Sequence, residues 1–278
     1  MTMRQSWVGA LQVALAALSW SFAGVLCKWL PWNAFTLNGI RALMAAALLG
    51  AIRGSFRVKI TRGTLLGAVG VALTSILFMV ATKLTTSANA IVLQYAMPVF
   101  VIAFCWIFYH QRPSLGNVVT AAFVMLGVVL CSWDGLSGGN PLGDFLAILS
   151  AVTFALVFFC SRLPDTNAQD YTYLGLVMCI PCGISAFFDP NLSADPLQWL
   201  AVCAMALCLA GGYFFISLSM RRVSLISAAL LANIEPVLNP LWVFIFLGEQ
   251  PGLLTIVGAI IVLSAATVYS IAGRTSER

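Results

Sequence analysis

The stretch "LANIEPVL" (residues 231–238) places a carboxylate, Glu235, beside a proline within a long apolar run. An ionisable side chain is costly to bury in such a run, and a proline removes one backbone hydrogen bond from a helix. A second stretch, "LQYAMPVF" (residues 93–100), matches the first at an offset of 138 residues. The same offset relates Pro113 to Pro251, which indicates that the proline-containing segment belongs to an internal repeat.

The composition is that of an integral membrane protein. Of the 278 residues, 61% are hydrophobic and 8% are charged, against roughly a quarter charged in an ordinary soluble domain. Apolar runs of 18 or more residues indicate transmembrane helices, because about 20 helical residues cross the hydrocarbon core. We predict ten spans, joined by linkers too short for a soluble domain: 6–28, 34–52, 63–82, 88–109, 114–133, 143–162, 171–188, 197–220, 225–247 and 251–272.

The repeat extends over both halves of the chain. "FTLNGIRA" (35–42) corresponds to "YTYLGLVM" (171–178) at an offset of 136. At an offset of 134, three pairs correspond: Gly9 with Gly143, Ala17 with Ala151, and Lys28 with Arg162. We therefore predict one membrane unit of two five-helix repeats, residues 1–138 and 139–278. Because five is odd, the second repeat enters the membrane from the opposite face.

The predicted fold class is thus an all-α membrane protein with ten transmembrane helices in two inverted five-helix repeats. Inverted repeats are typical of secondary transporters, in which two similar halves move about a site near the middle of the membrane. The sequence therefore predicts transport by alternating access.

The distribution of basic residues predicts the orientation. With both chain termini in the cytoplasm, only two basic residues of the loops, Lys28 and Lys83, lie on the external side of the membrane, which satisfies the positive-inside rule. Eleven basic residues then lie on the cytoplasmic side: Arg4, Arg53, Arg57, Lys59, Arg62, Arg112, Arg162, Arg221, Arg222, Arg274 and Arg278. The formal net charge of +5 follows from this topology, and we expect no nucleic-acid partner.

The chain resembles the drug/metabolite transporter superfamily, in its ten-helix EamA-type branch. The resemblance rests on the five-plus-five layout, on Arg41, on "TTSANAIVLQYAMPVF" (85–100) and on "SAALLANIEPVLNPLWVFIFLGEQP" (227–251). In the first half, Met97 replaces the acid and "HQRP" replaces "GEQP".

This resemblance implies an exporter of small metabolites in a bacterial inner membrane. Within the branch, the chain is similar to exporters of aromatic and other neutral amino acids. The alternative is an exporter of multiple drugs, cationic compounds or nucleoside-type metabolites with the same fold.

Two charged side chains, Arg41 and Glu235, are predicted to lie deep in the membrane. Glu235 is about eleven residues into its span, roughly 15 Å deep, and Arg41 lies at a similar level, roughly 20 Å from the inner face. They could form a buried ion pair that acts as a gate, as a proton-coupled switch or as scaffolding. Alternatively, Arg41 could face a cavity and bind a substrate carboxylate. From the sequence we favour a structural or gating role for Arg41.

Polar and aromatic side chains within the spans are candidates for a substrate cavity, because an amphipathic substrate needs ring faces and a few fixed polar groups. The spacing of Glu235, Asn239 and Trp242 places an acid, an amide and an indole on one helix face. Pro98, Pro236 and Pro240 are predicted to break their helices. The predicted cavity residues are Trp20, Asn38, Asn89, Gln94, Tyr95, Phe154, Phe158, Tyr213, Asn233, Asn239 and Trp242.

The sequence argues against an enzyme. It has one histidine, His110, and no cluster of metal ligands or paired nucleophile and base, so we expect neither a metal nor another cofactor. No phosphate-binding loop of the GxxxxGK[ST] type is present, which leaves a gradient to drive transport. The expected partners are a small-molecule substrate and the lipid bilayer. The fifth and tenth spans should be peripheral struts, which are compatible with a homodimer, although a monomer suffices.

Overall fold

The computed structural model describes residues 3–110, 112–131, 133, 140–238, 242, 245 and 252–275, and these are helical or in short connections. No strand occurs in this part of the chain. The helices are α1 (Met3–Trp20), α2 (Ala23–Trp29), α3 (Ala34–Arg53), α4 (Arg62–Leu84), α5 (Ser87–Gln94), α6 (Met97–Tyr109), α7 (Leu115–Cys131), α8 (Pro141–Cys160), α9 (Ala168–Cys179), the 3-10 helix η2 (Ile180–Phe188), α10 (Pro196–Ser219), α11 (Leu225–Ala232) and α13 (Leu253–Thr275).

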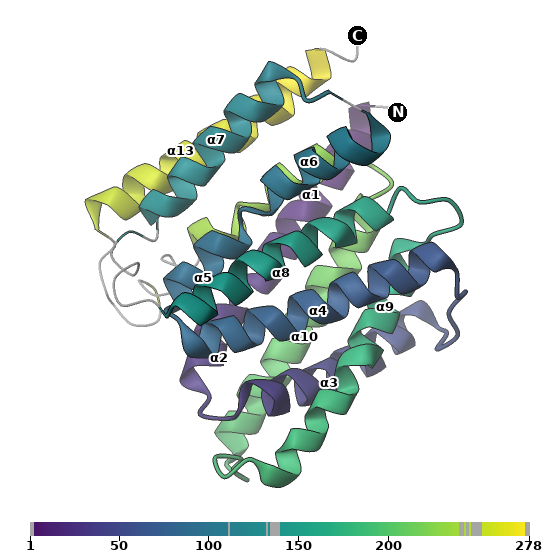
Figure 1. Cartoon of the computed structure of the whole chain (residues 1–278), viewed down its shortest axis with the longest axis vertical. Coiled ribbons are helices and arrows are strands. Elements are labelled where there is room, and N and C mark those ends of the chain that lie inside the picture. Colours follow the sequence, from purple (N-terminus) through teal and green to yellow (C-terminus); the bar gives the residue numbers. More distant parts are fainter. Residues whose placement is uncertain are drawn as a thin grey trace.

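These helices agree with the predicted spans. Within the described residues, seven helical segments are long and apolar enough to cross a membrane, and three shorter apolar segments, 115–130, 225–238 and 253–265, occupy the remaining predicted spans. The start of α1 and the end of α13 lie at the same face of the bundle (Figure 1), which we call the terminal face. The opposite face is called the far face.

Two spans differ from the prediction of continuous helices. The first is interrupted at Ser21 and Phe22, where α1 ends and α2 begins, and the Ser21 hydroxyl donates to the carbonyl of Leu18 (2.7 Å). Such a side-chain bond competes with the helical hydrogen-bond ladder. The seventh span changes from an α-helix to a 3-10 helix at Ile180, next to Pro181, whose nitrogen cannot donate.

The broken helices show the repeat in atomic detail. Thr86 caps α5 by accepting from the backbone N–H of Asn89, and Ser224, 138 residues later, caps α11 in the same way. Both helices then turn at residues related by the same offset, Tyr95 and Asn233. Each break lies just before its proline, so Pro98 and Pro236 occupy early positions of the following helical segment. A proline costs little there, since that N–H would have no partner within the helix.

Packing between the repeats follows the same symmetry. α1 packs on α10, and α8, its counterpart in the second repeat, packs on α4. Gly9 allows α1 to approach Arg222 and Val223, while Gly143 allows α8 to approach Leu84 and Thr85, the residues that correspond at the 138-residue offset. The two repeats are therefore interlocked rather than side by side.

A close backbone contact joins α3 to η2. A Cβ atom added to Gly39 would lie 2.0 Å from the nitrogen of Gly183 and 2.4 Å from its Cα atom. A Cβ atom added to Gly183 would lie no closer than 3.6 Å to a neighbour, an ordinary contact. Only Gly39 must be a glycine for the helices to pack this closely.

This asymmetry predicts the effect of two matched substitutions. Gly39→Ala should destabilise the protein by about 3 kcal/mol, because the backbone of η2 must move away, and this corresponds to a decrease in Tm of roughly 6 °C or more. Gly183→Ala should leave Tm nearly unchanged. Thermal unfolding of both purified variants in detergent measures the difference, and equal decreases would contradict the assigned contact.

The pair α7 and α13 lies along one edge of the bundle (Figure 1). Gly127 of α7 approaches Val262 and the carbonyl of Gly258 on α13. Large hydrophobic side chains on this pair, including Phe123 and Ile260, are exposed, as expected for a surface that faces lipid. The prediction that the fifth and tenth spans are peripheral is confirmed.

Candidate functional site

A cavity lies at the centre of the bundle, where the broken helices of the two repeats meet. Its walls come from α1, α2, α3, α4, α5, α8 and α10 and from the breaks that follow α5 and α11. It is lined by Trp20, Ala23, Arg41, Thr74, Ser75, Phe78, Gln94, Tyr95, Phe154, Leu209, Tyr213 and Glu235. Both repeats contribute, so the cavity is shared by the two halves.

Arg41 lines this cavity without an acidic partner. The side chain is 3% exposed, and its Nη2 donates to Asn38 Oδ1 (3.0 Å) and Ser75 Oγ (2.9 Å). Its Nε has no hydrogen-bond partner in the described part of the chain. The described residues form two ion pairs, Arg53 with Asp170 and Lys59 with Asp165, and neither includes Arg41. A buried guanidinium held by neutral groups, with an unused donor, is suited to bind an anion.

Glu235 lines the same cavity and is 8% exposed. The hydroxyl of Tyr95 donates a hydrogen bond to its carboxylate. Tyr95 lies at the break of the first repeat and Glu235 directly after the break of the second, so this bond connects the two broken helices. Arg41 and Glu235 therefore share one cavity, as their predicted depths indicated, but they do not form an ion pair with each other.

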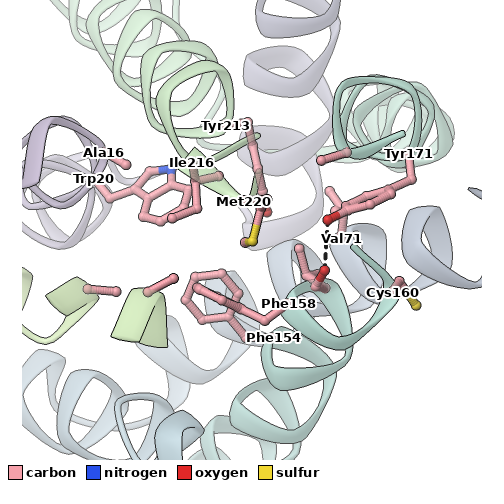
Figure 2. Close-up of a cluster of buried hydrophobic side chains, with 14 of the residues drawn as sticks. Ala16, Trp20, Val71, Phe154, Phe158, Cys160, Tyr171, Tyr213, Ile216 and Met220 are labelled. Atoms are coloured by element: carbon pink, nitrogen blue, oxygen red, sulfur yellow. Dashed lines mark hydrogen bonds between the residues drawn. The ribbon is translucent and has the colours of Figure 1, made fainter. Parts of the chain in front are cut away.

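Aromatic rings form a large part of the cavity wall (Figure 2). The ring of Trp20 packs edge to face against Phe154, at a centroid distance of 5.5 Å, and against Tyr213, at 5.4 Å. Gly212 on α10 lies directly against the indole of Trp20, since an added Cβ atom would be 2.0 Å from its Nε1. The rings of Trp20, Phe154 and Tyr213, which come from α1, α8 and α10, therefore form one aromatic cluster.

Of the predicted cavity residues, Trp20, Gln94, Tyr95, Phe154 and Tyr213 line the cavity, together with Arg41 and Glu235. Asn38 lies directly behind the wall, where it accepts hydrogen bonds from Arg41 and Ser75. Phe158 is fully buried, and its ring packs on that of Phe154 at a centroid distance of 5.3 Å.

The other predicted residues are not part of the cavity wall, or they lie outside the described residues. Asn89 donates to Asp144 (3.1 Å) near the far face, and Asn233 donates to the carbonyl of Ala229 (3.0 Å) within its own helix. Trp242 donates to Ser21 (2.8 Å) and stacks on Phe22. Asn239 and Pro240 lie outside the described residues.

Several wall residues were not predicted. Ser75 supports Arg41 and Thr74 lines the cavity beside it, and both are polar residues in the middle of an apolar span. The same criterion that selected Asn38 could have found them. Phe78, Ala23 and Leu209 are apolar residues in apolar helices and have no such distinguishing feature in the sequence.

The cavity is small in this structure. Its volume is about 50 Å³, whereas pockets that enclose small-molecule ligands typically have 300 Å³ or more. Nearly all of its lining side chains are buried. A substrate larger than a few water molecules therefore requires movement of the walls.

Comparison with solved structures identifies the same architecture elsewhere. A structure described as "Crystal structure of protein" superimposes with a TM-score of 0.79 over 97% of this chain and 99% of that chain, at 20% sequence identity. At this identity the likeness establishes the fold alone. No curated protein matched the sequence.

Comparison with protein families gives a more specific result. The sequence profile of the EamA-like transporter family matches twice, over residues 7–133 and over residues 141–271. The two matches correspond to the two repeats and together cover nearly the whole chain. This protein is therefore a membrane protein that belongs to the EamA-like transporter family.

Proposed function

We propose that this protein exports zwitterionic amino acids, aromatic and other neutral ones, by alternating access through the central cavity. The observation that carries the proposal is that one cavity, shared by both repeats, contains a buried guanidinium and a buried carboxylate that do not neutralise each other. Such an arrangement complements a ligand that has both charges.

The charges of an amino acid match those of the cavity. A carboxylate of the substrate would accept hydrogen bonds from Arg41, whose Nε is unused, and its ammonium group would donate to Glu235. Within a site that excludes water, each contact is stronger than at a surface, because less solvent screens the charges. Binding would also relieve the cost of holding an isolated guanidinium away from water.

The aromatic wall supports an apolar substrate body. Trp20, Phe154 and Tyr213 present ring faces and edges next to the charged groups. Aromatic side chains of a substrate pack well against such rings, in offset or edge-to-face geometry. A lipophilic cation could use the rings and Glu235, but it would be repelled by Arg41, so the drug-exporter alternative fits the cavity less well.

The broken helices provide the moving parts in this proposal. The cavity lies between the breaks of both repeats, which are joined by the Tyr95 to Glu235 hydrogen bond. Rocking of one repeat against the other would expose the cavity to each side in turn. By the positive-inside rule we place the terminal face on the cytoplasmic side of a bacterial inner membrane, where export would begin.

Uptake into proteoliposomes tests this function. Purified protein should give saturable movement of labelled L-phenylalanine and L-leucine, whereas 2-phenylethylamine, a nucleoside and a lipophilic cation should move no faster than in protein-free liposomes. Movement confined to the lipophilic cation would support the drug-exporter alternative instead, and movement confined to the nucleoside would support a nucleoside-type exporter.

A further inference from the structure

A second cavity lies between the central cavity and the terminal face. It is formed where the ends of α6 and α8 meet the start of α11, and its volume is about 300 Å³. This volume falls within the range of pockets that hold small molecules. Six residues line it: Cys105, Tyr109, Arg162, Ser224, Leu225 and Ile226. We call it the terminal-face pocket.

Arg162, which is exposed, and the start of α11 face this pocket, and none of the described residues that line it is acidic. Arg162 donates through Nη2 to the carbonyl of Val223 (2.8 Å), which holds the guanidinium beside the start of α11. Leu225 and Ile226 are the first two residues of α11, so their backbone N–H groups have no acceptor within the helix. The guanidinium and these N–H groups together favour an anion.

The remaining walls are suited to an organic anion rather than an inorganic one. The hydroxyl of Tyr109 is buried and has no hydrogen-bond partner among the residues that the structure describes. Its ring packs against Phe159 at a centroid distance of 5.1 Å, and Leu225 and Ile226 add aliphatic surface. A ligand with a carboxylate and an apolar body would satisfy the polar groups and cover the apolar walls.

The terminal-face pocket and the central cavity lie on the same helix faces. On α8, Phe154 lines the central cavity and Phe158 follows at i+4 (Figure 2), while Arg162, in the turn two residues after the end of α8, lines the pocket. On α6, Met97, Val101 and Cys105 have the same spacing. Residues four apart lie one above the other on a helix, about 6 Å apart along its axis.

One layer of side chains therefore separates the two cavities. It contains Val101 and Phe158, which are at most 1% exposed, and Ala229, one turn after Leu225 on α11 and fully buried. The side chains of this layer are apolar, so no side-chain hydrogen bond within it must be broken for it to open. Rotation of Phe158 or a small shift of α11 would connect the cavities.

We propose that the terminal-face pocket is a second binding site, which receives the carboxylate end of a small aromatic or aliphatic acid before it passes the Val101–Phe158–Ala229 layer into the central cavity. Arg162, the start of α11 and the Tyr109 hydroxyl hold the carboxylate, and the apolar body lies toward Phe158. The role of this pocket as a loading site rests on the proposed export function, whereas its ligand chemistry does not.

Equilibrium binding tests the ligand chemistry directly. The probe is labelled phenylacetate, which has the ring and the carboxylate but no ammonium group, and it is added to purified full-length protein in detergent. The Arg41→Gln background removes the anion-binding group of the central cavity and should retain binding. Adding Arg162→Gln to this background should weaken binding by about threefold, since a contact to an exposed charge contributes about 0.2–1 kcal/mol. Unlabelled 2-phenylethylamine should not compete.

Two further variants separate binding from folding, because Arg162 also supports Val223. Tyr109→Phe keeps the ring on Phe159 and removes only the buried hydroxyl, and Ile226→Trp fills the pocket without touching Arg162. Both should weaken phenylacetate binding in the Arg41→Gln background while Tm stays within a few degrees. Arg222→Gln removes a basic residue from the same face but outside the pocket, and it should bind as the background does.

Transport kinetics test the loading role. In proteoliposomes of known orientation, Arg162→Gln should raise the KM for L-phenylalanine about threefold from the terminal face, while the KM from the far face does not change.

The outcomes separate the two proposals. If the wild-type protein moves no amino acid, the export function fails, and Arg162-dependent phenylacetate binding alone decides whether the pocket is a binding site. If the wild type moves L-phenylalanine, unchanged binding in the Arg162 variant, or equal changes of KM at both faces, would overturn the inference for the pocket and leave the export function standing.

Discussion

Arg41→Gln is expected to reduce the kcat/KM of L-phenylalanine transport by about 100-fold, corresponding to about 2.7 kcal/mol, because removing one partner of a buried charge pair costs about 2–5 kcal/mol. The physical reason is that the guanidinium lines the central cavity and has no acidic partner of its own among the described residues. Glutamine offers no charge to the substrate, and its amide group ends two bonds short of the Nη2 atom that donates to Asn38 and Ser75. Rates of labelled L-phenylalanine counterflow measure the effect.

Protein stability distinguishes binding from scaffolding at this position. If Arg41 mainly supports the fold, Arg41→Gln should lower Tm, whereas an isolated buried charge is costly and its removal should leave Tm unchanged or raise it. Arg41→Lys serves as the matched variant: it keeps the charge, loses the forked geometry and should recover only part of the transport. A normal transport rate in Arg41→Gln would exclude the proposed carboxylate contact.

Glu235→Gln is expected to abolish accumulation of substrate against its gradient while exchange continues. Glu235 is the one acid among the residues that line the central cavity, so it is the candidate to carry a proton when the substrate is absent. Glutamine can still accept the hydrogen bond of Tyr95 but does not titrate. With a gradient of about 1 pH unit and the membrane potential held at zero, one coupled proton supports an approximately tenfold concentration ratio. This ratio should fall to about 1 in the variant.

Asp144→Asn provides the control for this prediction. Asp144 accepts hydrogen bonds from Thr85 (2.7 Å) and Asn89 (3.1 Å) near the far face and does not line the cavity. The Asp144→Asn variant should still accumulate substrate against its gradient, since asparagine can accept those hydrogen bonds. Accumulation that persists in Glu235→Gln would exclude Glu235 as the proton carrier and leave it a structural connection between the broken helices.

Much of the fold could be predicted from the sequence because the membrane restricts the solutions. An apolar run of about 20 residues has little alternative to a spanning helix, and an odd number of spans in each repeat requires an inverted arrangement. Pro98 and Pro236, related by the offset of 138 residues, were predicted to break their helices, and the structure has the breaks three residues earlier, at Tyr95 and Asn233. The break after Trp20 and the 3-10 helix at Ile180 were not predicted, since the first depends on a single serine and both depend on local packing.

The candidate site was predicted less completely. Polar residues in apolar spans identified Gln94 and Tyr95 as cavity residues and Arg41 and Glu235 as gating or coupling residues, because a polar side chain there needs a protein interior or water. The same criterion selected Asn89, which instead bonds to Asp144. A sequence pattern shows that a buried polar group must be satisfied, but the neighbouring helices decide whether a cavity or another side chain does so.

The sequence by itself determined the membrane class, the inverted repeat, the broken helices and the charged residues within the membrane. These features depend on hydropathy, chain geometry and residue chemistry along the chain. Only the tertiary structure decided that Arg41 and Glu235 share a cavity without pairing, and that a second pocket lies one side-chain layer away. Both depend on distances between helices that are far apart in the chain, and a few ångströms there separate an ion pair from two free charges.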